Sequence, residues 1–135
     1  MNEITVEARV ENIPIVTAFI DGELEKADCS PKAQMQIDIA IDEIFANISS
    51  YAYLPGTGNA TVRFELEEEN RTAVIRFLDC GIPFNPLETE EPDITLPAEK
   101  RRIGGLGIFM VRKTMDSVAY EYANGQNILT IRKQI

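Results

Sequence analysis

Two polar side chains in a predicted helix have the types and the spacing to do chemistry. Glu43 and Asn47 stand four residues apart in the segment DEIFAN (42–47), so both project from one helix face, one turn apart. A carboxylate in this position can orient or deprotonate a hydroxyl group. An amide oxygen can complete a magnesium shell beside phosphate. The same pair also fits an ordinary solvated polar face, so the spacing alone leaves both interpretations open.

A second candidate lies where an apolar strand ends. Residues 77–86 read FLDCGIPFNP, so the strand delivers Asp79 into a turn that contains Gly81. An aspartate at a strand end can accept a hydrogen bond from an exocyclic amine such as that of adenine. Gly81 lets a flat ring approach the backbone closely, because glycine has no Cβ. The alternative is an Asp-x-Gly turn that merely closes the strand.

The third candidate is a glycine-rich loop near the end of the chain. Residues 104–111 read GGLGIFMV, so three glycines in four positions run into an apolar segment of helical character. Such a loop brings bare N–H groups close to a ligand, and the helix start adds unpaired donors and partial positive charge. This combination favours phosphate binding, although Gly-Gly-x-Gly also occurs as a plain turn.

These candidates must be positioned by elements that the hydrophobic periodicity predicts. Residues 81–102 hold four of the seven prolines and no periodic pattern, which is typical of a lid or a mobile loop. The element order predicts one domain, an α+β two-layer sandwich with a mixed, mostly antiparallel sheet and its helices on one face. In chain order we expect a strand at 4–10, helices at 13–27 and 31–53, strands at 60–66 and 72–78, a helix at 106–115, and strands at 118–122 and 128–132. Asn12 is the expected cap of the first helix, residues 30–31 (Ser-Pro) open the second, and residues 124–126 (Asn-Gly-Gln) turn the last hairpin. The second helix carries an apolar stripe of four isoleucines, Ile37, Ile41, Ile44 and Ile48.

Composition excludes several kinds of function. The 135 residues carry a net charge of −9 and include no histidine. The acidic balance argues against nucleic-acid binding. Without histidine there is no Ser-His-Asp triad, no histidine zinc site and no phospho-accepting histidine. The N-terminus lacks a signal-peptide pattern, no apolar run reaches membrane-spanning length, and two cysteines make no disulfide framework. We therefore expect a cytoplasmic protein.

With the three motifs in this order, the chain resembles the GHKL ATPase superfamily, whose members share the Bergerat ATP-binding fold. The stretches DCGIPFNP (79–86) and GGLGIFMV (104–111) are most similar to those of the small anti-sigma-factor serine kinases. The resemblance covers nearly the whole chain. It implies one ATP-binding kinase domain over residues 1–135, an ATP lid at about 86–103, and ATP and Mg²⁺ as cofactors.

The resemblance also implies roles by position. Glu43 is the implied catalytic carboxylate, Asn47 holds magnesium against the nucleotide phosphates, and Asp79 binds the adenine amino group. The other cofactor-binding residues that it implies are Gly81, Pro83, Phe84, Arg101, Arg102, Gly104, Gly105, Leu106, Gly107 and Ile108, with one of the two arginines reaching the terminal phosphate.

Two departures from the family pattern stand out. Many relatives place a histidine shortly after the helix asparagine, whereas residues 49–53 here read SSYAY. The role of that histidine is absent or taken by Tyr51 or Tyr53. Pro83 replaces the second glycine of the wider superfamily's Asp-x-Gly-x-Gly, as is usual in the kinase subfamily. The proline argues against the chaperone and topoisomerase branches.

The implied function is an ATP-dependent serine-protein kinase of the anti-sigma regulatory type. Such a protein phosphorylates a STAS-domain anti-sigma-factor antagonist, sequesters a sigma factor, or does both, and the resemblance implies a homodimer. We expect neither nucleic acid nor a membrane as a direct partner. The alternative is a non-catalytic switch in which ATP or ADP selects between protein partners. A structural interaction module with a vestigial pocket is the third interpretation.

Overall fold

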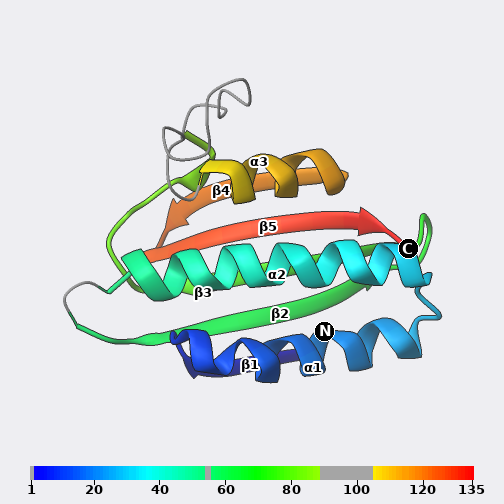
Figure 1. Cartoon of the computed structure of the whole chain (residues 1–135), viewed down its shortest axis with the longest axis horizontal. Coiled ribbons are helices and arrows are strands. Elements are labelled where there is room, and N and C mark those ends of the chain that lie inside the picture. The colour runs from blue at the N-terminus through cyan, green and yellow to red at the C-terminus, as the bar shows by residue number, and fades with distance from the viewer. Residues whose placement is uncertain (1, 54–55, 89–104) are drawn as a thin grey trace.

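The computed structural model describes residues 2–53, 56–88 and 105–135, with the side chains of residues 105 and 106 left out (Figure 1). Among the helices in these ranges, none is long and apolar enough to cross a membrane. The elements are β1 (Asn2–Glu7), η1 (Val10–Asn12), α1 (Ile13–Lys26), α2 (Pro31–Tyr51), β2 (Asn59–Glu67), β3 (Thr72–Asp79), η2 (Pro86–Glu88), α3 (Gly105–Thr114), β4 (Ser117–Ala123) and β5 (Gln126–Gln134), where η1 and η2 are single 3₁₀ turns.

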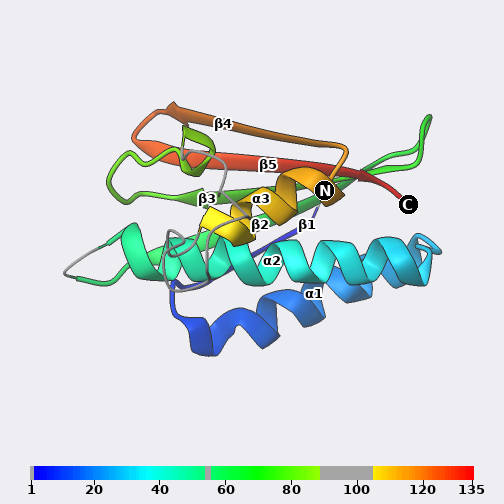
Figure 2. The ribbon, with the colours of Figure 1, turned by 45° about the horizontal axis from the view of Figure 1, so that its top comes forward.

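The described strands form a five-stranded sheet in the order β1-β2-β3-β5-β4. All four pairings are antiparallel, so no parallel pairing joins the described strands. The helices α1, α2 and α3 lie on the same side of this sheet (Figure 2). The predicted α+β two-layer sandwich is therefore confirmed.

The core lies between the sheet and α2. The predicted isoleucine stripe of α2 is buried at Ile37, Ile41 and Ile44. Ile48, one turn further along, is only partly buried, because it lies where the core gives way to a pocket. Alternate residues of the strands complete the core, as expected for a sheet with one covered face. They are Ala60, Val62 and Phe64 of β2, Ala73, Ile75 and Phe77 of β3, and Leu129 and Ile131 of β5.

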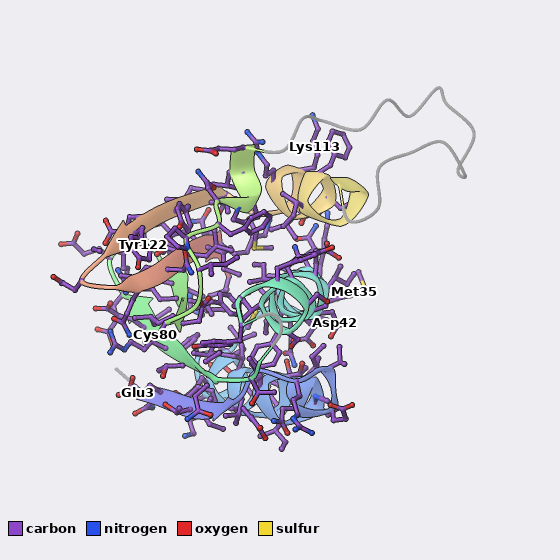
Figure 3. All side chains as sticks on the ribbon, turned by 90° about the vertical axis from the view of Figure 1, so that its left-hand side faces the viewer. Glu3, Met35, Asp42, Cys80, Lys113 and Tyr122 are labelled. Atoms are coloured by element: carbon purple, nitrogen blue, oxygen red, sulfur yellow. The ribbon has the colours of Figure 1, made fainter. Side chains whose placement is uncertain are left out.

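The other face of the sheet carries ion pairs between strands, two between neighbouring strands and one across β3, and Glu3 marks this side in Figure 3. These exposed pairs contribute little stability each. The pairs are Arg63 with Glu3 at 2.8 Å, Arg76 with Glu65 at 3.3 Å, and Arg132 with Glu67 at 2.6 Å.

The first strand is shorter than predicted. β1 ends at Glu7, and the Ala8 N–H makes one more link to the Gly58 carbonyl at 2.8 Å before the chain turns into η1. Asn12, the expected cap of α1, makes no capping hydrogen bond. Its side-chain amide instead donates to the Glu7 carbonyl at 2.8 Å. The Asn12 side chain, which we expected to cap α1, therefore stabilises the tight turn from β1 to α1 instead.

Other local signals are confirmed. The Ser30 hydroxyl caps α2 by accepting from the Ala33 N–H at 3.2 Å. Asn124 and Gly125 have φ values of 55° and 76°, and Ala123 pairs with Gln126 across them. Two left-handed residues in a two-residue loop are the geometry that suits a twisted hairpin.

An acidic pair lies where α1 packs on α2. Oδ1 of Asp21, Oδ1 of Asp38 and the hydroxyl of Thr17 are buried, and none has a hydrogen-bond partner in the described part of the chain. Burial raises the pKa of the Asp38 carboxyl from 3.8 to about 7, and the nearby carboxyls of Asp21 and Asp42 add to the rise. Because this pKa lies above its ordinary value, the folded state holds a proton that the unfolded chain releases near pH 4.

This pair makes stability depend on pH. The contribution of protonated Asp38 is fully present below about pH 4 and is lost as the pH rises through about 7. We expect Asp38→Asn to raise the free energy of unfolding at pH 8 by on the order of 1 kcal/mol, since solvent screening weakens the effect at a half-exposed carboxyl. Urea denaturation between pH 4 and pH 8 measures this difference.

The control is Asp28→Asn, which removes one exposed charge where a φ of 56° suits asparagine. It should leave the slope of stability against pH unchanged. An Asp38→Asn profile as steep as that of the wild type would contradict the assignment.

Candidate functional site

An open pocket lies between the second half of α2, α3, and the ends of β3, β4 and β5. Its walls are largely apolar, and Asn47, Asp79 and Asn127 supply polar atoms. Such a site binds a flat, mostly apolar ligand and orients it through a few polar contacts. The lining residues are Ile44, Asn47, Ile48, Tyr51, Ala52, Phe77, Asp79, Ile82, Phe84, Pro86, Ile108, Tyr120, Asn127 and Leu129.

Asp79 is the buried carboxylate of the pocket, at 5% exposure. Its Oδ1 accepts hydrogen bonds from the Gly81 N–H and from the side-chain amide of Asn127, both at 2.9 Å. Its Oδ2 makes no hydrogen bond with the described residues. The pocket therefore contains a carboxylate with one oxygen fixed and one left to accept from a ligand donor. The amine-binding role of Asp79 stays a prediction.

Asn127, which the sequence analysis missed, holds this arrangement together. Its amide nitrogen donates to Asp79 and to the Ile82 carbonyl at 2.8 Å. Its amide oxygen accepts from the Phe84 N–H at 3.1 Å and from the Tyr120 hydroxyl. The one available signal was a polar residue on the core-facing side of β5, in line with Leu129. That pattern does not say which buried group the amide meets.

Gly81 is required for a reason other than the predicted one. A Cβ at this position would lie 2.2 Å from the Ala52 carbonyl oxygen, just after α2. The next residue, Ile82, donates its N–H to the same carbonyl at 2.9 Å. The missing side chain thus lets the turn after β3 pack on the end of α2. The predicted approach of a ligand ring to Gly81 stays a prediction.

The two tyrosines considered as histidine replacements have different places. The Tyr53 hydroxyl donates to the Asn59 carbonyl at 2.6 Å and accepts from the Cys80 N–H at 2.8 Å, so it joins α2 to the strand ends. Tyr51 lines the pocket instead, with its ring centroid 5.8 Å from that of Phe84. Of the two, Tyr51 is the one that can contact a ligand.

Glu43 and Asn47 project from the same face of α2, as predicted. The Asn47 amide nitrogen lies 3.5 Å from Glu43 Oε1, and the Asn47 amide oxygen accepts no hydrogen bond from the described residues, so it can serve as a cation ligand. Burial raises the pKa of the Glu43 carboxyl, and the contact with Asn47 lowers it. Among the residues described, no three His, Cys, Asp or Glu side chains form a metal cluster.

The other predicted residues are placed as follows. Phe84 and Ile108 line the pocket. Pro83 is exposed in the adjoining turn. Gly105 begins α3, and Gly107 lies against Glu43. The side chain of Leu106, the residues Arg101, Arg102 and Gly104, and the lid from 89 to 103 lie outside the described residues. Pro86, at the start of the predicted lid, is buried in η2.

Comparison with protein-family models matches residues 6–133 to the histidine kinase-like ATPase domain. The chain belongs to this family, within the GHKL superfamily. All of the pocket-lining residues fall within the matched range. The resemblance drawn from the Glu-x-x-x-Asn, Asp-x-Gly and Gly-Gly-x-Gly motifs is thereby confirmed.

Curated relatives carry the names of kinases. The serine-protein kinase RsbW of Listeria monocytogenes is 29% identical over 128 residues, which cover 90% of this chain and 80% of the relative. The RsbW of Bacillus mycoides is 25% identical over 131 residues, covering 94% and 81%. The serine/threonine-protein kinase BtrW of Bordetella bronchiseptica is 26% identical over 102 residues, covering 76% and 71%.

The hydrogen bonds of Asn127 predict a stability effect. Asn127→Ala leaves Asp79 with one donor fewer and removes the partners of the Phe84 N–H and the Ile82 carbonyl. We expect the free energy of unfolding to fall by about 1–3 kcal/mol. Urea denaturation measures it. Gln126→Ala, on the opposite face of β5, serves as the control and should cost far less. Equal losses in the two variants would count against the network.

Proposed function

We propose that this chain is an ATP-dependent serine-protein kinase of the anti-sigma regulatory type. The observation that carries the proposal is the half-satisfied Asp79 carboxylate inside an apolar pocket that Asn47 also lines, with Glu43 in contact with Asn47 one helical turn away. Membership of the histidine kinase-like ATPase family supports ATP as the ligand. The kinase names of the relatives support phosphate transfer to a protein serine.

In this proposal, adenine enters the pocket and its amino group donates to the free Oδ2 of Asp79. The apolar walls and the Tyr51–Phe84 pair cover the faces of the ring. The phosphates extend towards Asn47 and the start of α3, where first-turn N–H groups favour negative charge. Mg²⁺, when bound beside the Asn47 amide oxygen, neutralises phosphate charge.

Transfer in this proposal is direct. The serine oxygen of the partner forms a bond to the γ-phosphorus while the bond from that phosphorus to the ADP oxygen breaks. Glu43 orients the serine hydroxyl and accepts its proton, which then passes to solvent. Because phosphoryl transfer has a loose transition state, it needs positioning more than a strong base.

The partners in this proposal come from the family resemblance and the relatives. A STAS-domain anti-sigma-factor antagonist supplies the serine, a sigma factor is the second partner, and the kinase acts as a homodimer in the cytoplasm. If the protein binds ATP and an antagonist but transfers no phosphate, a nucleotide-dependent switch replaces the kinase proposal.

Nucleotide binding is tested by thermal unfolding. At Mg-ATP concentrations about a hundredfold above the dissociation constant, we expect about 2.7 kcal/mol of stabilisation. Asp79→Asn should remove most of it, because an amide nitrogen would then compete to donate where the adenine amine donates. Asn47→Ala should remove only the part that depends on magnesium. A wild-type melting temperature that does not rise at millimolar Mg-ATP would refute the ATP-binding proposal.

Catalysis is tested by transfer of labelled γ-phosphate to a STAS-domain antagonist. Glu43→Gln keeps the size of the side chain and removes its charge. We expect it to retain ATP binding and to cut the transfer rate about a hundredfold or more. A serine-to-alanine antagonist is the negative control. Undiminished transfer by Glu43→Gln would show that Glu43 has no catalytic role.

A further inference from the structure

The carboxylate of Glu43 lies in the space that a side chain at Gly107 would occupy. A Cβ built on Gly107 would be 2.0 Å from Glu43 Cδ, and 2.1 and 2.3 Å from its two carboxylate oxygens. No real Cβ tolerates such distances, so the Glu43 carboxylate can occupy this space only because residue 107 is glycine, and a side chain at 107 would force the carboxylate to move. We call this space the Gly107 niche.

The niche belongs to the first turn of α3, since Gly107 is the third residue of the helix that begins at Gly105. The N–H groups of a first helical turn have no acceptor within the helix and favour an anion. Glu43 is the acidic side chain placed there. The same turn is the one that the glycine-rich motif predicts for nucleotide phosphate.

Few hydrogen bonds keep Glu43 in the niche. Within the described residues, its one hydrogen bond is the 3.5 Å contact from Asn47. Burial raises the pKa of the Glu43 carboxyl, so covering the ionised group has an unfavourable component. A carboxylate held mainly by packing is displaced more easily than one held by several donors.

We propose that Glu43 occupies the Gly107 niche in the nucleotide-free protein and that nucleotide phosphate expels it. The inference rests on the proposed function, because it assumes that phosphate binds at the start of α3. The Glu43 carboxylate and a nucleotide phosphate are both anions, so they repel each other and cannot both occupy the first turn of α3. Gly107 is then a positioning residue, because it leaves room beside α3 for the Glu43 carboxylate in the nucleotide-free protein. The carboxylate reaches an acceptor hydroxyl only after nucleotide has bound.

The contact is tested by a double-mutant cycle on the melting temperature. Alanine is the better helix former, so Gly107→Ala should raise the melting temperature by about 1–3 °C wherever the niche is empty. In the wild type the niche is filled, and we expect Gly107→Ala to lower the melting temperature. In a Glu43→Ala background we expect the sign to reverse.

The chain offers a matched control for this cycle. Gly22 also lies in a helix, and a Cβ there would meet nothing within 4 Å. Gly22→Ala should raise the melting temperature equally in both backgrounds. A Gly107→Ala effect with the same sign and size in both backgrounds would overturn the contact.

Expulsion is tested by the affinity for ADP, which binds without phosphate transfer. Removing the competing carboxylate by Glu43→Ala or Glu43→Gln should tighten ADP binding about two- to fivefold. Asp42→Asn removes the same charge one residue earlier, on the side of α2 away from the sheet (Figure 3), and should leave the affinity unchanged. Wild-type affinity in both Glu43 variants overturns this inference alone. Failure of every variant and of the wild type to bind ADP overturns the proposed function as well.

Discussion

The pair of hydrogen bonds to one oxygen of Asp79 is the interaction on which the site depends. A buried carboxylate is costly unless donors meet it. Here the donors come from the adjoining turn at Gly81 and from Asn127 on β5. The same asparagine holds the Ile82 carbonyl and the Phe84 N–H, so the pocket wall and the carboxylate are fixed together. The other oxygen of Asp79, Oδ2, can then accept a hydrogen bond from a ligand in the pocket.

The position of α2 is fixed by contacts with the turn that follows Asp79. Its C-terminal end meets the turn after β3 through the Ala52 carbonyl, and the Tyr53 hydroxyl ties it to Cys80 and Asn59. One helix therefore serves two purposes. Its isoleucine stripe forms the core with the sheet, while the edge of that stripe carries Asn47 beside the pocket. Because α2 is fixed both by its packing on the sheet and by the contacts at its C-terminal end, Glu43 and Asn47 have a defined position relative to Asp79.

Local sequence predicted the features that local energetics decide. Ser30 and Pro31 begin a helix, Asn124 and Gly125 turn a hairpin, and apolar periodicity separates helix from strand. The roles of Asn127, Gly81 and Gly107 were not predictable in this way, because each depends on a partner far along the chain. The end of β1 was misplaced for the same reason, since the turn there is fixed by contacts to Gly58 and from Asn12. The motifs thus named residues that line the pocket, among them Asn47 and Asp79. The hydrogen bonds that hold the pocket together could be found only from the fold.

The central claim is that an adenine nucleotide binds through the free oxygen of Asp79. The most direct measurement is an NMR titration that follows the side-chain amide of Asn127 and the backbone amide of Gly81, the two donors to the other oxygen of that carboxylate. The account predicts that ATP and ADP shift both resonances at a common affinity, while GTP, which offers a carbonyl where adenine offers its amine, shifts neither at the same concentration. Nucleotide shifts confined to other parts of the chain, with these two resonances unmoved, would contradict it.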